Sequence, residues 1–405
     1  MKSKIIEELQ SGLKKIVLEY GERLTGSLKN KEIAEYAKSY FKKNGYRVEE
    51  QNFSCIDWNE KGVELLFAGK KISAEASYYS PGCKIEAEYV KLSTIDDLEK
   101  SFLENKIAVL FGELTAEQIM PKSFAFYNPE HHQKIINLLE KKNPAAIITL
   151  VDNDTSVFED GDFDIPSVYV SKDVGKRIFK SESKIALTIK AERIPSTGSN
   201  IIARINENID KKIVITAHLD TKYGTPGALD NGTGIVILLL LSKLIKPEII
   251  DCCLELLLLN GEDYYSTPGQ IKYMEEYLAK DNNIILAINC DGVGLMNSKT
   301  AVAKMGLPKE NEMIINKLID QRENFEIIDP WVEGDHMLFK MNNIATVALT
   351  SKKIFEMIDN IIHTKEDKIE LVDYKIINEV INFLEELIKN YKAKEVNNNE
   401  KGENI

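Results

Sequence analysis

IVITAHLD, residues 213–220, is the stretch that sets the fold, because it is the first of three short apolar runs that each end in polar side chains. The second run is LELLLLNGED at 254–263, and the third is IILAINCDG at 284–292. Apolar runs of this length, separated by helical stretches, are typical of buried parallel strands in an alternating α/β arrangement. The sequence therefore predicts an α/β unit around these runs.

Acidic or imidazole side chains stand where each predicted strand ends. His218 closes the first run, the pair Glu262 and Asp263 closes the second, and Asp291 closes the third. In parallel sheets, ligands bind beyond the carboxyl ends of the strands. We therefore expect one imidazole and several carboxylates along one edge of the sheet, with Asp230 in the loop between the first run and the next helix.

These side chains have the chemistry of a metal centre. His363 adds a second imidazole where the segment HTKED, residues 363–367, precedes the last predicted helix. Two imidazoles and several carboxylates suit borderline divalent metals such as zinc. Two metals about 3.5–4 Å apart need a bridging carboxylate. Asp230, in the glycine-rich segment GALDNGTG at 227–234, is placed to supply it.

Other acidic positions are expected to support the metals. Asp220 lies two residues after His218 in an extended run, so it shares a face with the imidazole and is expected to hold its second ring nitrogen. Glu262 and Asp263 are neighbours whose side chains point apart, so we expect one to bind metal while the other takes the proton from the attacking water. Asp291 is expected to be a further terminal ligand.

The whole chain divides into four predicted regions. They are two helices and an edge strand at 1–53, short strands with one helix (129–141) at 54–194, the α/β unit at 195–393, and a disordered polar tail at 394–405. The segment STGSN at 196–200 marks a junction.

Two adjacent histidines, His131 and His132, lie in the helix predicted at 129–141. Neighbouring positions are about 100° apart around a helix axis, so at most one ring is expected to face a given site. We interpret both as solvated surface residues.

Composition limits the classes of partner. The formal net charge of −12 argues against nucleic-acid binding, for which a basic face is expected. The longest uninterrupted apolar run, residues 235–241, is too short to cross a bilayer. The first ten residues read as an amphipathic helix and not as a signal peptide. The five cysteines lack the spacing of a disulfide framework, so we expect free thiols and a cytoplasmic setting.

The ordered set of motifs resembles the M28 metallopeptidases, a family of co-catalytic dizinc aminopeptidases. The resemblance covers about residues 195–392 and rests on AHLD (217–220), GALDNGTG (227–234), GED (261–263), the strand-end Asp291 and HT (363–364). GERLTGS at 21–27 is similar to the family's N-terminal Arg-x-x-Gly-Ser segment, so residues 1–53 are expected to pack on the same domain.

The resemblance implies a three-layer α/β/α fold with a mixed, mainly parallel sheet. The middle region, residues 54–194, is similar to a protease-associated (PA) domain, a β-rich insert found in many members. Its motifs are KIAVLFG (106–112), PAAIIT (144–149) and DIPSVYV (164–170).

Carried over by position, the resemblance implies an aminopeptidase that removes N-terminal residues from peptides with two divalent cations, zinc first among them. Glu262 becomes the general base that activates a metal-bound water and then protonates the leaving amine. The implied metal ligands are Asp230 for both cations, His218 and Asp291 for one, and Asp263 and His363 for the other. In the loop EGDHMLF at 333–339, Asp335 or His336 is expected to orient substrate or stabilise the oxyanion.

Two departures from the family pattern affect these expectations. Asp263 stands where the family usually has glutamate, and its side chain is one methylene shorter, which bears on the affinity and identity of the second metal. The segment YYSTPG at 264–269 replaces the usual Gly-Leu-x-Gly-Ser, so the specificity wall is expected to differ.

Two other functions remain open at this point. A glutaminyl-cyclase-like enzyme shares the architecture and uses one zinc, and some relatives are binding proteins that have lost metal ligands. The sequence also leaves open zinc against cobalt or manganese, the role of the insert and the oligomeric state.

Overall fold

The computed structural model describes residues 2–124, 127–152, 155–175, 177–178, 184–280, 283–357 and 360–391. Two compact units emerge: unit 1 contains residues 1–53, 198–264 and the chain from 268 onward, and unit 2 contains residues 54–197 and 265–267. The tail predicted to be disordered, residues 394–405, lies outside the described residues.

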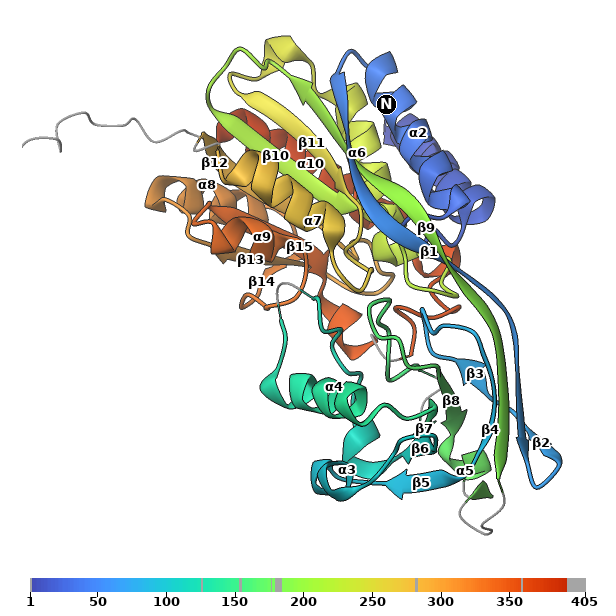
Figure 1. The fold of residues 1–405 in the computed structure, drawn as a ribbon. Coiled ribbons are helices and arrows are strands. Elements are labelled where there is room, and N and C mark those ends of the chain that lie inside the picture. Colours follow the sequence, from blue (N-terminus) through green and yellow to red (C-terminus); the bar gives the residue numbers. More distant parts are fainter. Residues whose placement is uncertain are drawn as a thin grey trace, which may run out of the picture. The chain divides into compact units, whose positions relative to one another are not determined.

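Unit 1 is built on a mixed sheet with helices on both faces (Figure 1). Its own strands are β10 (Lys212–His218), β11 (Cys253–Leu259), β12 (Ile284–Cys290), β13 (Thr300–Met305), β14 (Phe325–Ile327) and β15 (Thr346–Ser351). Two long strands, β1 (Arg47–Phe67) and β9 (Ile185–Ile205), begin in one unit and end in the other. The order in unit 1 is β14-β13-β15-β12-β10-β11-β9-β1, and β15, β12, β10 and β11 are mutually parallel. The predicted mixed, mainly parallel sheet is thereby confirmed.

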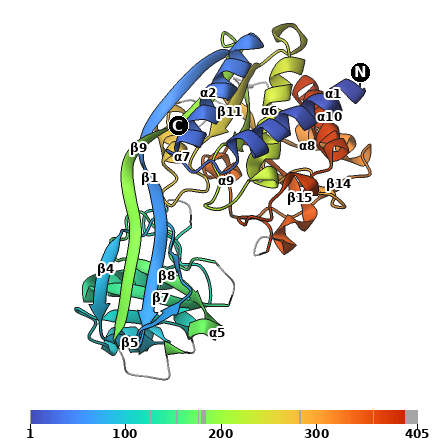
Figure 2. The same ribbon diagram turned by 90° about the vertical axis from the view of Figure 1, so that its right-hand side faces the viewer.

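The helices of unit 1 complete the layers. They are α1 (Lys2–Lys14), α2 (Leu28–Lys43), α6 (Thr233–Leu244), α7 (Pro268–Tyr273), α8 (Lys309–Asp320), α9 (His336–Met341) and α10 (Tyr374–Asn390). Short helical turns are η1 (Lys15–Tyr20), η4 (Ala228–Gly232), η5 (Pro247–Ile249), η6 (Met274–Leu278), η7 (Lys352–Glu356) and η8 (Ile369–Leu371). Helices α1, α2, α6 and α10 pack together on one face of the sheet (Figure 2), and α7 and α9 lie on the other.

The core of unit 1 explains why its central strands read as continuous apolar runs. Every residue of β10 and β11 is buried, because helices cover both faces of the sheet. Helix α6 packs closely at its start: a Cβ on Gly234 would lie 2.8 Å from the Cβ of Ala217 and 2.5 Å from the carbonyl oxygen of Cys290. Each leucine or isoleucine buried in this core contributes about 1.5–3 kcal/mol.

The helix ends follow local capping chemistry. The Ser27 side chain caps α2 by accepting a hydrogen bond from the Asn30 N–H at 3.2 Å. Asp373 caps α10 by accepting from the Lys375 N–H at 2.8 Å.

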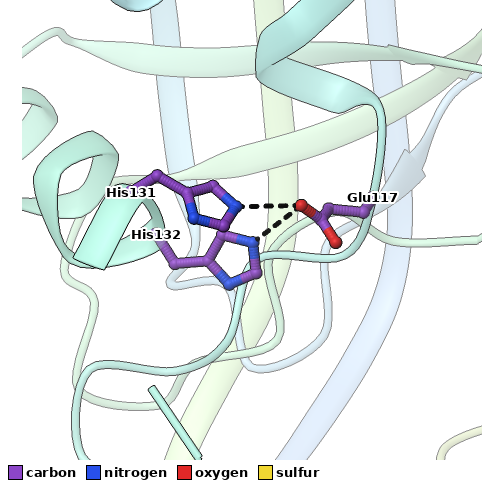
Figure 3. A group of neighbouring side chains, drawn as sticks. All are labelled: Glu117, His131 and His132. Carbon is purple, nitrogen blue, oxygen red and sulfur yellow. Dashed lines mark hydrogen bonds and ion pairs between the residues drawn. The ribbon is translucent and has the colours of Figure 1, made fainter. Parts of the chain in front are cut away.

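Unit 2 has a five-stranded sheet of order β3-β8-β7-β6-β5 and a hydrophobic core of its own. Its strands are β2 (Lys70–Ile72), β3 (Glu75–Ala76), β4 (Cys83–Ala87), β5 (Tyr89–Leu92), β6 (Ile107–Leu110), β7 (Ala146–Val151) and β8 (Ser167–Ser171). Its helices are α3 (Ile95–Lys100), α4 (Glu130–Lys142), whose first turn carries His131 and His132 (Figure 3), and α5 (Lys172–Gly175), with a short turn η2 (Gly112–Thr115).

Several sequence expectations meet the fold directly. The segment 196–200, expected to be a junction between regions, lies inside β9, so the chain passes from one unit to the other within a continuous strand. Each of the five cysteines, all within the described residues, carries a thiol and not a disulfide. None of the helices in the described part of the chain combines the length and apolar character needed to span a bilayer.

Candidate metal centre

The carboxyl ends of three neighbouring parallel strands meet at one edge of the unit 1 sheet. β10 lies between β11 and β12 and runs parallel to both. His218 is the last residue of β10, and Asp291 directly follows β12. Glu262 and Asp263 follow β11 after a short turn. The sheet register therefore brings all four side chains to the same edge.

Asp230 is carried by the turn η4 between β10 and α6. The backbone of Asp230 (φ −111°, ψ 91°) and Asn231 is not helical, and the peptide bond between them is cis. The Asn231 side chain ties the turn to β12, since its Nδ2 donates to the Cys290 carbonyl at 2.9 Å. Gly227 opens the turn at φ +63°, where a Cβ would lie 2.4 Å from the Thr221 Cγ2. Glycine is required there by both the backbone angle and the space.

Asp230 contacts both imidazoles, one through each carboxylate oxygen. Its Oδ1 lies 2.8 Å from Nε2 of His218, and its Oδ2 lies 2.9 Å from Nε2 of His363. On the first side, Oδ1 of Asp291 is 3.6 Å from the His218 Nε2. On the second side, Oδ1 of Asp263 is 3.4 Å from the His363 Nε2. The five side chains thus form two groups of three that share Asp230, which is the arrangement a bridged pair of cations needs.

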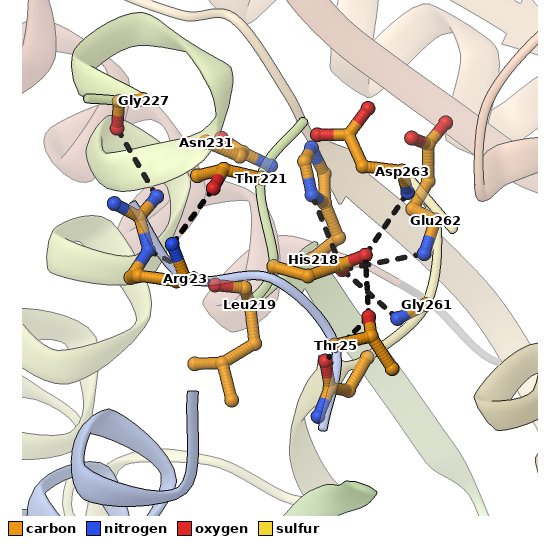
Figure 4. Close-up of polar contacts among 12 residues, drawn as sticks. Arg23, Thr25, His218, Leu219, Thr221, Gly227, Asn231, Gly261, Glu262 and Asp263 are labelled. Carbon is orange, nitrogen blue, oxygen red and sulfur yellow. Dashed lines mark hydrogen bonds and ion pairs between the residues drawn. The ribbon is translucent and has the colours of Figure 1, made fainter. Parts of the chain in front are cut away.

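Buried polar atoms in this centre lack the partners that such atoms usually have. Asp263 is 3% exposed, and within the described residues neither of its carboxylate oxygens has a hydrogen-bond partner. Figure 4 shows its side chain beside the His218 ring. A buried carboxylate without donors carries a desolvation cost that a bound cation would offset. Because imidazole nitrogens and carboxylate oxygens are ligands of zinc and related metals, the residues present fit divalent cations.

Burial and mutual charge shift the pKa values of the centre. Burial alone would lower the pKa of His218, but the surrounding carboxylates, Asp291 first among them, raise it well above its ordinary value. Burial raises the pKa of Asp263 to about 7, and the charge of Asp230 adds to the rise. Burial also raises the pKa of Glu262 well above its ordinary value, although His218 opposes the rise. The centre therefore carries more acidic groups than its imidazoles can neutralise, which favours cation binding.

Asp220 organises the loop that carries the acidic pair. Its fully buried carboxylate accepts hydrogen bonds from the three backbone N–H groups of residues 261–263, at 2.9, 3.3 and 3.1 Å. The hydroxyl of Thr25 donates to the same carboxylate at 2.9 Å (Figure 4). The carboxylate lies 3.7 Å from Nδ1 of His218, longer than an ordinary hydrogen bond. Its main contacts are therefore with the loop, a role that the residue pattern around His218 did not indicate.

A buried arginine from the N-terminal segment holds the loop between the first histidine and the bridging aspartate. Arg23 is 0% exposed and donates to three carbonyl oxygens of the segment 219–227, at 3.0–3.1 Å, and Figure 4 shows the contact with Gly227. Its backbone N–H donates to Oγ1 of Thr221 at 2.8 Å. Burial lowers the pKa of Arg23 to about 10, so it stays protonated at neutral pH. The motif GERLTGS indicated that this segment packs here, but gave Arg23 itself no role.

The two residues predicted to contact substrate stand at the start of α9. Asp335 is buried and accepts from Nε2 of Gln270 at 2.8 Å, while its other oxygen has no hydrogen-bond partner among the described residues. Burial raises the pKa of Asp335 to about 7 although the nearby His218 opposes the rise. His336 is 0% exposed, with its Nε2 at 3.0 Å from the Trp331 carbonyl and its ring packed edge-on to the indole. The His336 ring therefore holds its own loop, and its substrate role stays a prediction.

Unit 2 carries a second group of metal-binding residue types (Figure 3). Nε2 of His131 lies 3.0 Å, and Nε2 of His132 3.2 Å, from the same Glu117 oxygen. The prediction that at most one ring faces a given site was wrong, because Glu117 comes from the loop before the helix and both rings reach it. The prediction that both are surface residues was wrong for His132, which is 3% exposed.

Hydrogen bonding makes this second group unsuited to a metal. The backbone N–H of Met120 donates to Nδ1 of His132 at 3.1 Å, so the neutral ring carries its proton on Nε2, the nitrogen that faces Glu117. A metal on Nε2 would move that proton to Nδ1 and set two N–H groups against each other. The contact with Glu117 is an electrostatic pairing that needs no cation.

Comparison with known protein families gives a match for the part of the chain that carries the candidate metal centre. Residues 200–388 match the profile of peptidase family M28. No curated protein sequence matches the chain. The identification of unit 2 as a PA-like domain stays a prediction.

Solved structures share the fold of the chain at low sequence identity. An aminopeptidase from Aneurinibacillus sp. strain AM-1 is similar with a TM-score of 0.74 and 19% identity, covering 95% of this chain and 93% of that chain. A zinc aminopeptidase from Bacillus subtilis has the same TM-score, 0.74, and 19% identity, covering 95% and 94%. A glutaminyl cyclase from Bacteroides thetaiotaomicron has a TM-score of 0.54 and 14% identity, covering 96% and 98%. These likenesses confirm the expected α/β fold.

Proposed function

We propose that this chain, whose residues 200–388 match the profile of peptidase family M28, is a hydrolase of peptide bonds and, more specifically, a metal-dependent aminopeptidase. One observation carries the proposal: the two carboxylate oxygens of Asp230 lie 2.8 and 2.9 Å from two different imidazoles. A carboxylate in that position suits two cations held side by side.

We assign the ligands of two divalent cations, with zinc as the expected metal. Asp230 binds both, His218 and Asp291 complete the first site, and Asp263 and His363 complete the second. The shorter side chain of Asp263 supports this second site, because its Oδ1 reaches 3.4 Å from the His363 Nε2. Neither oxygen has a hydrogen-bond partner among the described residues, which leaves both available to a cation.

The reaction assigned to the centre is hydrolysis of the first peptide bond. Bound divalent cations would polarise the scissile carbonyl and lower the pKa of a water. Glu262 acts as general base: it takes a proton from that water and delivers it to the leaving amine as the C–N bond breaks. Burial suits Glu262 to this work, since a raised pKa makes its carboxylate a stronger proton acceptor than an ordinary glutamate.

Asp220 and Asp335 have supporting roles in this proposal. Asp220 positions the general base, because it holds the backbone of residues 261–263 through three hydrogen bonds. Asp335 acts on the substrate side: its Oδ2 is buried, has no hydrogen-bond partner in the described part of the chain, and is available to the cationic amine of a free N-terminus. The proposed substrates are therefore peptides with an unblocked first residue.

The test is a peptidase assay on the full chain with unblocked and N-acetylated versions of the same short peptides. We expect cleavage of the unblocked peptides alone, loss of activity with a chelator and recovery with Zn²⁺. Glu262→Gln should lower kcat by about 10²–10⁴-fold with its metal content unchanged. Glu117→Gln, in unit 2, is the matched control and should stay fully active. Full activity after chelation, or in Glu262→Gln, would overturn the proposal.

A glutaminyl-cyclase-like enzyme with one zinc is the second candidate. It is favoured by the likeness in fold to a glutaminyl cyclase and by aspartate at position 263 in place of the usual glutamate. Elemental analysis distinguishes the two: two metals per chain support the aminopeptidase, and one metal together with cyclisation of N-terminal glutamine supports the cyclase. A chain that binds no metal would instead support a binding protein of the same fold.

A further inference from the structure

The segment that carries His363 also carries a buried carboxylate whose contacts no part of the proposed reaction uses. Asp367 is 0% exposed and lies four residues after His363. Its Oδ1 accepts from the Leu229 N–H at 2.8 Å and its Oδ2 from the Asp230 N–H at 3.0 Å. Its backbone carbonyl accepts from the Ala228 N–H at 3.3 Å. Three successive amides of the turn that presents Asp230 therefore end on one residue.

The two halves of the metal centre are positioned by different means. His218 and Asp291 end neighbouring strands whose hydrogen-bonded register sets their spacing. His363 has left-handed backbone geometry (φ 60°), and its side chain is 40% exposed. Outside any strand, its distance from Asp230 must be set by contacts between loops.

Asp367 supplies contacts of this kind, and a hydrogen bond between Thr225 and Thr364 adds another. The hydroxyl of Thr225 donates to the Thr364 carbonyl at 2.6 Å, so the two loops are joined at two places. Arg23 donates to the carbonyls of Pro226 and Gly227 at 3.0 and 3.1 Å. The Asp367 carboxylate thus binds N–H groups of the turn, and the Arg23 guanidinium binds the carbonyl groups at its start.

We infer that Asp367 is a positioning residue that sets the affinity of the second metal site by fixing Asp230 relative to His363. The inference rests on the proposed two-metal centre. The first site should depend on Asp367 much less, because sheet register already holds His218 and Asp291. Carboxylate is the required group, since both of its oxygens accept from backbone N–H groups. An amide would offer one acceptor and turn its own N–H₂ toward the other amide.

The experiment is titration of the metal-free full chain with Zn²⁺ against a competing chelator, which reports both affinities. In Asp367→Asn we expect the first site, which shares Asp230, to weaken much less than the second, which should weaken by about 10–100-fold, the usual range for a residue that orients a ligand. Asp367→Ala should weaken the second site further. Asp97→Ala is the matched control in unit 2, because the Asp97 carboxylate also accepts from two backbone N–H groups, those of Ser93 and Thr94. It should leave both affinities unchanged.

First-site affinity serves as the internal measure of folding for the Asp367 variants. If both affinities are retained in Asp367→Asn and Asp367→Ala, the inference about Asp367 is overturned while the proposed two-metal centre stands. Equal weakening of both sites would also overturn it, because Asp367 would then be a general scaffold residue. A wild-type chain that takes up a single Zn²⁺ would overturn the two-metal centre, and this inference with it.

Discussion

Each unit holds a group of histidine and acidic side chains close enough to share a cation, and the two groups differ in how far hydrogen bonds already occupy them. In unit 1, Asp263 is buried and neither of its carboxylate oxygens has a hydrogen-bond partner within the described residues. In unit 2, His132 is as buried, and its Nε2, 3.2 Å from Glu117, likewise has no hydrogen-bond partner among the described residues, but the Met120 N–H occupies its Nδ1. Residue types alone do not separate the groups. The distinction comes from which nitrogen and oxygen atoms remain available.

Substitution of the bridging residue should have the largest effect. Asp230→Ala removes the one side chain shared by both groups of ligands, so we expect loss of both metals and a fall in kcat/KM of at least about 10³-fold, in keeping with the several kcal/mol that metal catalysis supplies. Elemental analysis and peptide hydrolysis measure the two effects. Glu117→Ala is the control, and loss of a metal from that variant would contradict the distinction between the units.

Asp220→Asn should have the next largest effect. The amide keeps the size of the side chain but offers one acceptor oxygen to the three N–H groups of residues 261–263. The loop that carries Glu262 therefore loses hydrogen bonds that fix its position. We expect kcat to fall by about 10–100-fold, with KM little changed. Unaltered kcat in this variant would show that the loop is held by other contacts.

The pH dependence of stability should also differ between the metal-free and metal-loaded chain. Asp263, Asp335 and Asp367 have folded pKa values of about 7, raised chiefly by burial. Their burial therefore penalises the metal-free fold in full above pH 7, and the penalty shrinks as pH falls from 7 towards the ordinary aspartate pKa of about 3.9. The pKa of His363 is raised to about 9 by Asp263 and Asp230 against the opposing effect of burial, so its stabilising contribution is lost as pH rises through 9.

Both trends have the same sign. The metal-free chain should be more stable at pH 6 than at pH 9, by on the order of 2–4 kcal/mol. Metal binding needs deprotonated ligands, so the stabilisation by Zn²⁺ should instead grow with pH. Denaturant unfolding with and without Zn²⁺ measures both trends. A metal-free chain that is most stable at pH 9 would contradict the buried, uncompensated carboxyls inferred for unit 1.

The smallest effects are expected in unit 2. His132→Ala leaves the Met120 N–H without its acceptor and should cost about 1–3 kcal/mol of stability. His131→Ala removes an exposed contact with Glu117 and should cost less than about 1 kcal/mol. Neither variant should change the number of metals bound. A Zn²⁺ site lost in either one would show that His132 can release its hydrogen bond to bind metal.

Sequence reasoning reached the fold and the side chains of the centre for a physical reason. Apolar runs such as 213–217 report burial on both faces of a strand, and residues at the ends of adjacent parallel strands must meet at one edge. His218 and Asp291 follow from that rule alone. The same rule placed the pair Glu262 and Asp263 at this edge, and the resemblance then assigned the metal to Asp263. The place of His363 in the centre came from the resemblance, because no local pattern says which loop returns to the sheet edge.

Contacts between distant backbone groups were beyond that reasoning. Asp220 was assigned to the His218 ring, whose Nδ1 lies 3.7 Å from its carboxylate, but its hydrogen bonds with the backbone of residues 261–263 were not anticipated. Arg23 and Asp367 carried no expected role, although both are buried against the turn that presents Asp230. The angle between successive helix positions was correct in principle for His131 and His132, but both flexible side chains reach one acceptor from another loop.

The amino-acid sequence by itself determined the layered sheet, the ends of its strands and the kinds of ligand at those ends. It could do so because apolar runs and the side chains that follow them are properties of neighbouring residues. The tertiary structure alone decided which oxygens and nitrogens are left for a cation and which are already engaged. That decision depends on loops far apart in the chain meeting at hydrogen-bonding distance, as the segment after His363 meets the turn at Asp230.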